Sequence, residues 1–368
     1  MTTPLLSICI PTWNRADLLE PGLEYLLEYC RLHSPRIEVV VADNASTDRT
    51  PTVAARWRHD PNFRYFRREH NITGNGNIVQ TPRDFARGEY TWVIGDDDVI
   101  LPGALSKLID LLTTYPDVDY FITNYSHESL DQRNSLIRVR PTAYSPPADT
   151  LICPDLTVGR YDSLARVLEL AQGDFRFLTH VVGQITRTRR WREVRLSSEI
   201  FSPNMSFQTL EDTFPHLMLL LQGAKSRPVV YCGQPLVLAS IGGQAWANIK
   251  WLDCLYRCHE LRLHWREQGV APGHLHLMQR IWIRQWTGDL GNIWFHSSGP
   301  KIRIGLVMKF LFRSLSQPFF LLGRFLPLLT KKAYVTLPET GKRLWRVIRP
   351  ERPVAAVVPE KTGISRPL

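Results

Sequence analysis

Residues 90–102 read Tyr-Thr-Trp-Val-Ile-Gly-Asp-Asp-Asp-Val-Ile-Leu-Pro, and this stretch decides the fold. Its first five residues are an apolar run of the kind that forms a strand buried on both faces of a sheet. Three consecutive aspartates follow at positions 96–98, and Pro102 then opens the next predicted helix, residues 103–114. The stretch therefore predicts a buried strand that ends in an acidic turn and continues into a helix.

The same alternation of strand and helix patterns covers the first 125 residues. Strands separated by helices of this length indicate a mostly parallel, doubly wound α/β sheet. Ligands of such sheets bind beyond the carboxyl ends of the strands, so residues 11–15, 43–48 and 96–98 are expected to share one site. The other predicted strands are residues 5–10, 37–42, 62–67 and 118–125, and the other predicted helices follow Asn14 as N-cap, open at Thr50, and span 75–87.

The later part of the chain has a less regular pattern. Residues 126–160 are rich in proline and predict an irregular excursion, whereas residues 246–295 are helical in pattern and rich in tryptophan. We expect three regions: a domain over 1–240, with a donor half of about 1–125 and an acceptor half of about 126–240; a helical, amphipathic region over 241–335; and a basic, proline-containing tail over 336–368. Further helices are predicted at 162–171 and 211–221, and a strand at 228–232.

The composition excludes several classes of protein. A chain of 368 residues with 44% hydrophobic content can bury a full core. Its six cysteines include no C-x2-C pair, and Cys254, Cys258 and His259 lack a fourth zinc ligand at metal spacing, so reduced thiols of a cytoplasmic protein are expected. The start of the chain lacks a basic secretory n-region, and no window of about 18 uncharged apolar residues occurs to cross a bilayer.

The net charge of +10 lies in the C-terminal tail. From Lys301 onward there are 14 of the 45 basic and 3 of the 35 acidic residues, which leaves 31 basic and 32 acidic residues before it. Residues 301–352 interleave Lys and Arg with large apolar side chains, as in helices that lie on an anionic membrane. The alternative is a pair of amphipathic helices packed on the body. A nucleic-acid partner is not expected, because the tail lacks a recognisable motif.

The strand-end residues suggest specific chemistry. Carboxylates at positions 96–98 suit Mg2+ or Mn2+, which commonly bind substrate phosphates as well, although a solvated, helix-capping turn is the alternative. Residues 43–48 offer carboxylates to a nucleobase or ribose, or else form an Asx turn. Residues 11–15 lead into a helix N-terminus, a natural anion site, or are an ordinary turn. The pair Glu211 and Asp212 offers a general base, or merely two acids placed favourably at a helix N-terminus.

Taken together, these motifs resemble family 2 glycosyltransferases with the GT-A fold. The resemblance is strongest over residues 5–125 and extends to about residue 240. The segment GEYTWVIGDDD looks most similar to abequosyltransferase-like enzymes of surface-polysaccharide assembly. The motifs, in family order, are LLSICIPTWNR (5–15), IEVVVADNASTDRT (37–50), HNITGNGN (70–77), GEYTWVIGDDDVILPGAL (88–105) and LEDTFPHL (210–217).

The resemblance implies a role for each matching residue. The nucleotide pocket would be lined by Pro11, Thr12 and Arg15, with Asp43 at the base and Ser46 and Asp48 near the nucleoside. Asp97, Asp98 and Asp96 would hold a divalent metal, with Asp96 also on the donor side. Asp212 would be the catalytic base, supported by Glu211.

Two departures from the family pattern affect these assignments. Gly95 stands where the family's first motif aspartate is expected, which makes Asp97 the best candidate metal ligand. The turn at residues 71–74 is one residue longer than usual, which affects the expected donor-side position of Asn77.

The expected enzyme is an inverting, metal-dependent transferase that moves a hexosyl or deoxyhexosyl group from a UDP-, dTDP- or CDP-sugar to an acceptor hydroxyl. The acceptor is expected to be a lipid-linked oligosaccharide, at the inner face of the cell membrane. One alternative is transfer directly to polyprenyl phosphate. Another is a metal-dependent nucleotide-binding protein without transferase activity.

Overall fold

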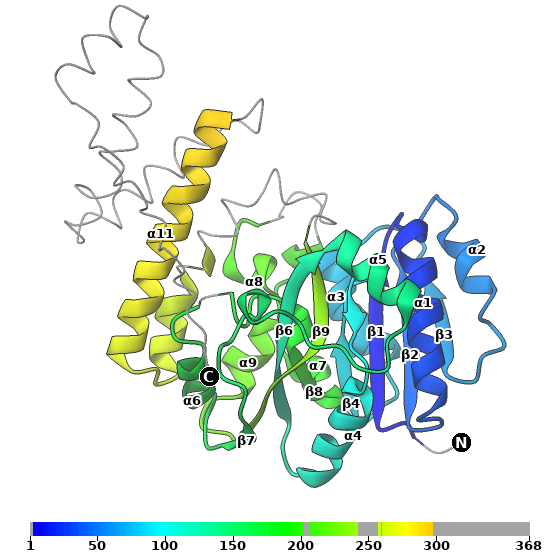
Figure 1. Ribbon diagram of the computed structural model, residues 1–368, viewed down its shortest axis with the longest axis horizontal. Helices are drawn as coiled ribbons and strands as arrows, with labels where there is room; N and C mark the ends of the chain where they lie inside the picture. Colours follow the sequence, from blue (N-terminus) through cyan, green and yellow to red (C-terminus); the bar gives the residue numbers. More distant parts are fainter. Residues whose placement is uncertain (1–2, 175, 202–206, 242–256, 259, 297–368) are drawn as a thin grey trace, which may run out of the picture.

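The computed structural model describes residues 3–174, 176–201, 207–241, 257–258 and 260–296 (Figure 1). Over these residues a single sheet of nine strands has the order β3-β2-β1-β4-β8-β6-β9-β5, with β7 paired to β9. The strands are β1 (Leu6–Thr12), β2 (Ile37–Asp43), β3 (Phe63–Arg67), β4 (Tyr90–Val93), β5 (Val99–Ile100), β6 (Tyr120–Ser129), β7 (Val158–Tyr161), β8 (Gln184–Arg187) and β9 (Val229–Ile241).

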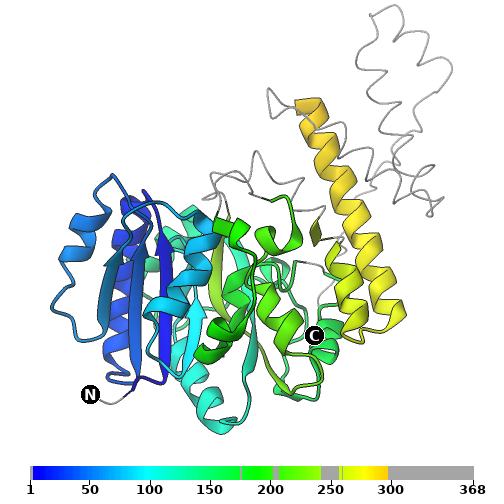
Figure 2. The ribbon, with the colours of Figure 1, turned by 180° about the vertical axis from the view of Figure 1, so that it is seen from behind.

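The N-terminal half of the sheet is entirely parallel. β1 pairs with β2 on one side and with β4 on the other, and β3 pairs with β2. α1 (Ala16–Arg31) and α5 (Leu130–Val139) lie on one face of the sheet, and α3 (Gly74–Phe85) and α7 (Thr188–Glu193) lie on the other (Figures 1 and 2). This arrangement brings the carboxyl ends of β1, β2 and β4 to the same edge, as the sequence predicts.

The C-terminal half of the sheet mixes strand directions. β8 runs antiparallel between β4 and β6, whereas β9 runs parallel to β6 and antiparallel to β5. β9 is much longer than the predicted strand at 228–232, because it continues through a register shift opposite Asn124. The α/β fold class is confirmed, and four of the sheet's pairings are antiparallel.

The core follows from the composition of the strands. β2 is buried along its whole length, and Val39, Val40 and Val41 are inaccessible to solvent. Trp92 of β4 is fully buried, and its indole N–H donates to the carbonyl of Val182 at 2.8 Å. A buried indole with a partner adds a large apolar area without an unsatisfied donor.

Several elements differ from the sequence-based prediction. α5 lies inside the segment predicted to be irregular, and β8 and α7 had no predicted counterpart. The predicted helix 211–221 is two helices, α8 (Leu210–Thr213) and α9 (Leu217–Gly223), because Pro215 lacks an N–H and cannot continue a helix. The remaining helices are α2 (Thr50–Ala55), α4 (Ala104–Thr114), α6 (Leu164–Leu170) and α11 (Pro272–His296), with 3-10 turns η1 (Ala148–Thr150), η2 (Val181–Gly183) and η3 (Ser198–Phe201).

Part of the C-terminal prediction lies outside the described residues. That holds for residues 246–256 of the predicted tryptophan-rich helical region, and for the whole basic segment 301–352 and tail 336–368. None of the helices that the structure does describe is both long and apolar enough to cross a membrane.

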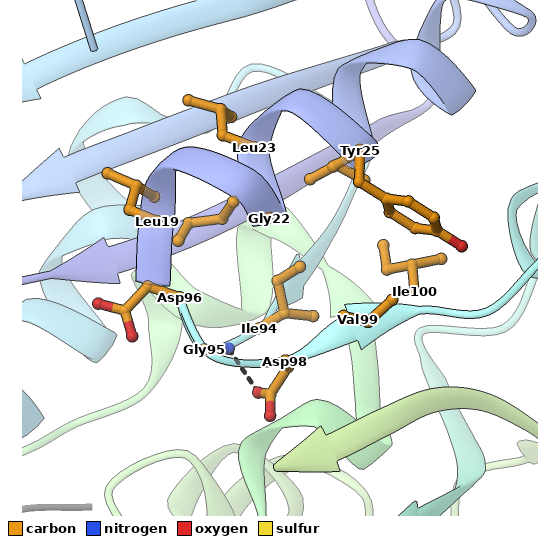
Figure 3. A pocket seen from close by; sticks show the side chains of 12 residues that line it. Leu19, Gly22, Leu23, Tyr25, Ile94, Gly95, Asp96, Asp98, Val99 and Ile100 are labelled. Atoms are coloured by element: carbon orange, nitrogen blue, oxygen red, sulfur yellow. Dashed lines mark hydrogen bonds between the residues drawn. The ribbon is translucent and has the colours of Figure 1, made fainter. Parts of the chain in front are cut away.

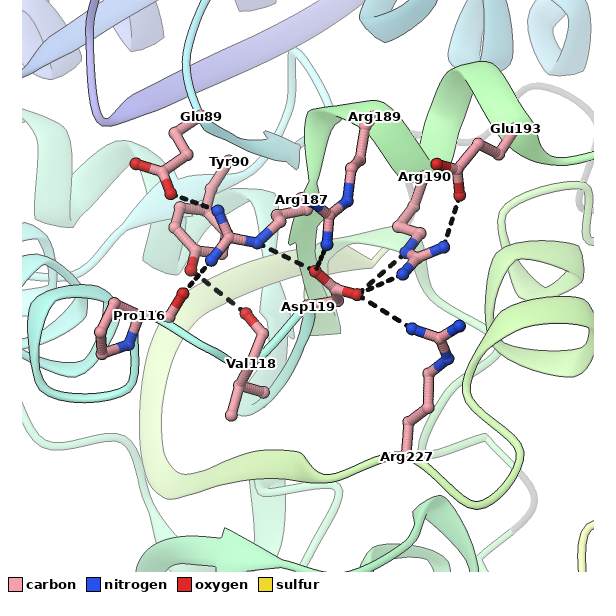
Figure 4. A network of polar contacts seen from close by, with 10 residues as sticks. All are labelled: Glu89, Tyr90, Pro116, Val118, Asp119, Arg187, Arg189, Arg190, Glu193 and Arg227. Atoms are coloured by element: carbon pink, nitrogen blue, oxygen red, sulfur yellow. Dashed lines mark hydrogen bonds and ion pairs between the residues drawn. The ribbon is translucent and has the colours of Figure 1, made fainter.

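Four arginines surround one carboxylate at the sheet edge opposite the strand-end loops (Figure 4). Asp119, just before β6, contacts Arg190 Nε at 3.0 Å and Arg189 Nη2 at 2.7 Å. Arg187 Nε lies 2.9 Å and Arg227 Nη1 3.5 Å from the same carboxylate. Burial raises the pKa of Asp119, but the hydrogen bond from Arg190 and the nearby guanidinium charges outweigh it and lower the pKa below its ordinary value. This cluster joins the ends of β6, β8 and β9.

Candidate active site

The loops after β1 and β2 are bonded to each other. Asn14 adopts a left-handed conformation with φ of 53°. Its side-chain oxygen accepts from the backbone N–H of Thr47 at 2.7 Å, and its own N–H donates to Ser46 Oγ at 2.8 Å. Asn14 was expected to cap α1, and that expectation is wrong, because its side chain bonds the neighbouring loop instead.

Asp48 caps α1 from that neighbouring loop. Its Oδ2 accepts from the N–H of Ala16 at 3.0 Å, and its Oδ1 accepts from the N–H of Thr50 at 2.9 Å. Burial raises the pKa of Asp48, but hydrogen bonds from Thr50 and Ala16 lower it further, so the net shift is downward. One carboxylate therefore fixes the starts of two helices and the loop between them.

Asp43 lies at the end of β2 with no solvent exposure. Its Oδ1 accepts from the N–H of Ser46 at 2.8 Å and its Oδ2 from the hydroxyl of Tyr65 at 2.6 Å. Burial and the hydrogen bond to Asp43 raise the pKa of Tyr65, which keeps its hydroxyl as a donor. Because each carboxylate oxygen has two lone pairs, an N–H of a base has to share an oxygen with these donors.

The side chain of Asn77 forms hydrogen bonds within the protein. It is 1% exposed, its amide nitrogen donates to the carbonyl of Ala42 at 2.8 Å, and its oxygen accepts from Arg68 Nε at 2.9 Å. Asn44, which the sequence-based list omitted, joins the same region, because its amide bonds Asn71 Oδ1 at 2.8 Å. Asn77 thus supports the end of β2 from within.

The acidic turn after β4 is joined to the end of β1. Thr12 Oγ1 donates to Asp96 Oδ2 at 2.6 Å, and Arg15 bridges the turn, with Nε 3.2 Å from Asp96 Oδ1 and Nη2 2.7 Å from Asp97 Oδ2. Pro11, the residue before Thr12, pairs with Ala42 across β1 and β2. Four of the residues predicted for the site, Thr12, Arg15, Asp96 and Asp97, are therefore in direct contact.

Asp98 points to the other side of the turn and is held by backbone amides. Its Oδ2 accepts from the N–H of Gly95 at 2.7 Å, and its Oδ1 accepts from the N–H of Ser240 at 3.1 Å. The hydroxyl of Ser240, near the end of β9, also donates to the carbonyl of Asp97 at 2.5 Å. A Cβ at position 95 would lie 2.6 Å from Asp98 Oδ2 and 2.7 Å from Asp97 Oδ1, so a larger residue would require these two carboxylates to shift.

The turn holds more negative charge than its neighbours balance. Three carboxylates, each at most 7% exposed, face the guanidinium groups of Arg15 and the fully buried Arg133. Arg133 Nη2 donates to the carbonyls of Leu18 at 2.7 Å and Asp96 at 3.3 Å. Burial raises the pKa of Asp96 to about 6, and burial with the charge of Asp97 raises the pKa of Asp98 to about 8. A cation would relieve this excess.

The donor atoms suit a divalent cation that is shared with a substrate. Among the residues that the structure describes, no three His, Cys, Asp or Glu side chains converge as a complete metal site. Mg2+ needs only one or two carboxylates when phosphates and water complete its shell. The hard oxygens of Asp97, with Asp96 beside it, meet that requirement, whereas Asp98 has both oxygens engaged by backbone amides.

A small recess lies directly behind the acidic turn (Figure 3). It has about 10 Å³ of free space, close to what one water molecule requires, and Asp96 and Asp98 stand at its rim. The rest of its lining comes from α1 and from the strands on either side of the turn, including Leu19, Gly22 and Ile94. This recess is too small for a nucleotide.

The candidate base lies in the second half of the chain. Asp212 is 3% exposed, and its Oδ2 accepts from the N–H of Gln208 at 2.9 Å. Thr209 caps α8, and Asn75 of α3 donates to the backbone carbonyl of Asp212. The neighbouring Glu211 accepts from the N–H of Ser197. It therefore supports the segment around Asp212 rather than the Asp212 carboxylate. Asp212 is thereby linked to the donor half through α3.

Four further residues of the site were given no individual role from the sequence. Asn44 lies within the expected range 43–48, directly after Asp43 at a strand end. Trp13 was also within reach: it is 50% exposed in the loop between β1 and α1, an unusual position for so large an apolar ring. Arg133 and Ser240 carry no local signal, because only the fold brings α5 and β9 against the acidic turn.

Comparison with known proteins shows which family the chain resembles. Residues 7–168 match the family model described as Glycosyl transferase family 2. An abequosyltransferase of Salmonella typhimurium is 26% identical over 242 residues, which cover 64% of this chain and 66% of the relative. A GalNAc(5)-diNAcBac-PP-undecaprenol beta-1,3-glucosyltransferase of Campylobacter jejuni is 32% identical over 107 residues, 29% of this chain and 34% of the relative. The chain thus spans just under two thirds and about one third of these relatives.

Solved structures share the fold. Residues 1–349 of TarS from S. aureus superpose with a TM-score of 0.50 at 15% sequence identity, over 79% of this chain and 74% of that one. The complex of the same TarS fragment with UDP gives a TM-score of 0.50 at 16% identity, over 79% and 75% of the two chains. This likeness concerns the GT-A architecture alone.

Proposed function

Through residues 7–168 this chain belongs to glycosyltransferase family 2, and on that premise we propose that it transfers a sugar from a nucleoside diphosphate sugar to a hydroxyl of a lipid-linked saccharide. The observation that carries the proposal is that the loop after β1 contacts both the loop after β2 and the acidic turn after β4, where Arg15 bridges Asp96 and Asp97. Two relatives support the substrate class: one is named an abequosyltransferase, and the other acts on an undecaprenol diphosphate-linked saccharide by its name.

The donor half is proposed to bind the nucleotide over the joined loops. The exposed ring of Trp13 offers a face on which a nucleobase can stack, and the fixed backbone around Ser46 and Asp48 lies next to it. Asp43 accepts an N–H from the base through a lone pair that its present donors leave open. Pro11 and Thr12 form the floor at the end of β1.

The acidic turn is proposed to hold Mg2+ or Mn2+ through Asp97, with Asp96 beside it and Asp98 as the carboxylate that shapes the turn. A bound divalent cation supplies positive charge against the leaving diphosphate. Arg15 contributes a second positive group at the same place, fixed by its two carboxylate contacts. The preformed backbone of the turn keeps these groups in position without reorganisation.

Asp212 is proposed to take the proton of the acceptor hydroxyl, with Glu211 holding the segment around it. A carboxylate that removes this proton while the donor diphosphate leaves from the opposite face accounts for a single displacement. The anomeric carbon then inverts. We infer the same domain division as from the sequence, with the donor half at about 1–125 and the acceptor half at about 126–240.

The hydrogen bond that Asp43 can accept distinguishes between the possible bases of the donor. Uracil and thymine present an N3–H to a carboxylate, whereas cytosine presents only its exocyclic amine on that side. The abequosyltransferase relative favours a deoxyhexosyl group, and the site chemistry favours UDP or dTDP. A thermal-shift panel of UDP-, dTDP- and CDP-sugars with Mn2+ tests this, and the cognate donor is expected to raise the melting temperature most.

The transfer step is tested with Asp212→Asn. The variant should bind the donor as the wild type does, with an unchanged thermal shift, and lose transfer by roughly 10²-fold or more, as expected for removal of a general base. Near-normal transfer by Asp212→Asn would contradict the base assignment. Absence of any metal-dependent thermal shift across the whole panel would contradict the proposed function itself.

The basic segment 301–352 is proposed to attach the enzyme to the inner face of the cell membrane, where a lipid-linked acceptor resides. It lies outside the described residues, so the proposal rests on its sequence, in which Lys and Arg alternate with Phe and Leu. Cosedimentation with anionic liposomes should weaken as salt rises. Selective binding to nucleic acid instead would contradict it.

A further inference from the structure

Three histidines from distant segments gather in the acceptor half. His127 lies on β6, His180 immediately precedes η2, and His216 immediately precedes α9. The rings of His127 and His180 have centroids 5.5 Å apart in an edge-to-face arrangement. Tyr125 completes the group, with its ring centroid 5.4 Å from that of His127 and 5.7 Å from that of His180. The proposed transfer chemistry uses none of these rings.

Three of the six ring nitrogens in this group have no hydrogen-bond partner among the described residues. Nδ1 of His180 and both ring nitrogens of His216 are buried without a hydrogen bond, and His216 is 5% exposed. A buried polar nitrogen without a partner is destabilising, and most buried polar groups in native structures are hydrogen-bonded, so these nitrogens are candidates for binding a ligand. The ring of Tyr125, by contrast, is fixed, because its hydroxyl donates to the carbonyl of Arg176 at 3.0 Å.

The position of the histidines relates them to both halves of the site. The charge of Asp97 acts on His180, and His180 in turn acts on His216. His216 follows the candidate base, Asp212, by four residues along the same segment. In a single displacement the acceptor hydroxyl has to lie between the base and the donor, and the influence of Asp97 on His180 places the histidines near that part of the site.

The protonation state of the three imidazole rings indicates which class of ligand they can bind. Burial lowers the pKa of His127 to about 3 and that of His216 to about 3, and burial also lowers the pKa of His180. Neutral imidazole has one N–H and one lone pair, which match a hydroxyl group that both donates and accepts. A phosphate would call for Arg or Lys. A metal ion is not favoured, because no metal-ligating cluster of three occurs within the described part of the chain.

We propose that His127 and His180, with the ring of Tyr125 as an apolar wall, bind the hydroxyl groups of the acceptor's sugar, and that His216 orients His180 from behind. This inference rests on the proposed function and deepens it. His127 and His180 are half-buried, so a saccharide can reach them, whereas the enclosed His216 is a positioning residue. The acceptor-binding residues thus come from β6 and from the segment before η2.

The proposal is tested with methyl glucoside, methyl galactoside and methyl mannoside as probes, by saturation-transfer NMR on the full chain in the presence of the nucleoside diphosphate. His180→Phe and His127→Phe keep a ring and remove the nitrogens. Each is expected to weaken glycoside binding about tenfold or more, while the thermal shift given by the nucleotide stays unchanged. His276→Phe, at an exposed histidine of α11, is the matched control and should bind as the wild type does.

The role of His216 has its own readout. His216→Phe should weaken glycoside binding less than His180→Phe does, and His216→Gln, which restores a donor and an acceptor, should recover it. Long-range 1H–15N spectra of the wild type provide a measurement that needs no folded variant, since the His180 nitrogens are expected to shift when glycoside is added. Unshifted nitrogens, or glycosides that bind neither wild type nor variants, would overturn the histidine site.

Failure of this inference is distinguishable from failure of the proposed function. If the wild type hydrolyses or transfers the donor and the histidine variants bind glycosides normally, only the histidine site is wrong. If glycoside binding depends on His127 and His180 but no donor is turned over, the saccharide site stands and the transferase proposal falls.

Discussion

Asp97 differs from its two neighbours in how its carboxylate is used. Asp96 is engaged by Thr12 and Arg15, and Asp98 by two backbone amides, whereas within the described part of the chain the only hydrogen bond to the Asp97 carboxylate comes from Arg15. A carboxylate with a free oxygen beside a positive side chain can still take a cation. The three aspartates of one turn therefore have three different surroundings, which their sequence does not reveal.

Replacing Asp97 by Asn is expected to reduce metal-dependent transfer by roughly 10²-fold, because one charged cation ligand is lost without a change of shape. Activity titrated with Mn2+ measures this, and a higher Mn2+ requirement should accompany the loss. Glu69→Gln, at an exposed acid outside the turn, is the control. A variant with an unchanged Mn2+ dependence would move the metal to another carboxylate.

The exposed ring of Trp13 is expected to contribute to the affinity for the donor nucleotide. Stacking of a base on an aromatic ring contributes about 1–3 kcal/mol, so Trp13→Ala should weaken nucleotide binding by roughly ten- to hundredfold, and Trp13→Phe by less. Calorimetric titration with the cognate nucleoside diphosphate measures it. Leu32→Ala, at an apolar side chain that is 77% exposed at the other end of α1, should leave affinity unchanged. Equal affinity of Trp13→Ala and wild type would remove the ring from the site.

At the scale of elements, the first helix is held by a residue outside it. No side chain of its own N-cap residue, Arg15, bonds the start of α1, and Asp48 supplies that bond from the loop after β2. The start of α1 and the start of α2 consequently depend on the same carboxylate. Both loops at the donor side are thereby held in one conformation.

Asp48→Ala is expected to lower the free energy of unfolding by about 1–2 kcal/mol, the usual loss for a helix cap, and to weaken nucleotide binding by loosening both loops. Urea denaturation and nucleotide titration measure the two effects. Asp17→Ala is the control, since that side chain is 89% exposed and pairs with the exposed Arg49. Unchanged stability in Asp48→Ala would show that the loops are held by Asn14 alone.

The elements that the sequence predicted are those whose pattern is local. β1, β2 and β4 are short apolar runs followed by turn residues, and the helices between them carry apolar stripes. α5 was missed because its ten residues are mostly polar, and its function in the fold is to bring Arg133 under α1. The break between α8 and α9 follows from Pro215, whereas the apolar run after it favours one continuous helix.

At the scale of the molecule, Asp119 and its arginines stabilise the sheet far from the strand-end loops. Its folded-state pKa lies below the unfolded value of about 3.9, so its contribution to stability is complete above about pH 4. That contribution disappears as the pH falls through the lower, folded-state pKa. Four arginines around one carboxylate also leave a surplus of positive charge if the carboxylate is removed.

Asp119→Asn is therefore expected to lower the free energy of unfolding by about 3 kcal/mol at pH 7, as for a broken buried ion pair. The difference from the wild type should shrink as the pH is lowered from 5 to about 2. Asp117→Asn, whose side chain is 59% exposed and pairs with Arg160, is the matched control and should change stability by less than about 1 kcal/mol. A difference that does not depend on pH would contradict the charge argument.

The candidate site was predictable only where its residues follow strands in order. Thr12, Arg15, Asp96 and Asp97 meet because β1 and β4 are parallel neighbours, which the alternation of elements implies. Ser240 could not be found in this way, because its contact depends on β9 returning to the acidic turn across the sheet. The side-chain partners of Asn77 likewise follow from packing and not from its place in a motif.

The bonds from Ser240 to the acidic turn have a consequence for synthesis on the ribosome. Asp98 and Ser240 are 142 residues apart in the chain. At about 5–20 residues per second, on the order of ten seconds pass between the emergence of the three aspartates and the arrival of the amide that holds the last of them. During that interval the acidic turn of the nascent chain lacks the hydrogen bonds from Ser240. We therefore expect that the donor half binds nucleotide sugar in its final geometry only after the acceptor half has been synthesised.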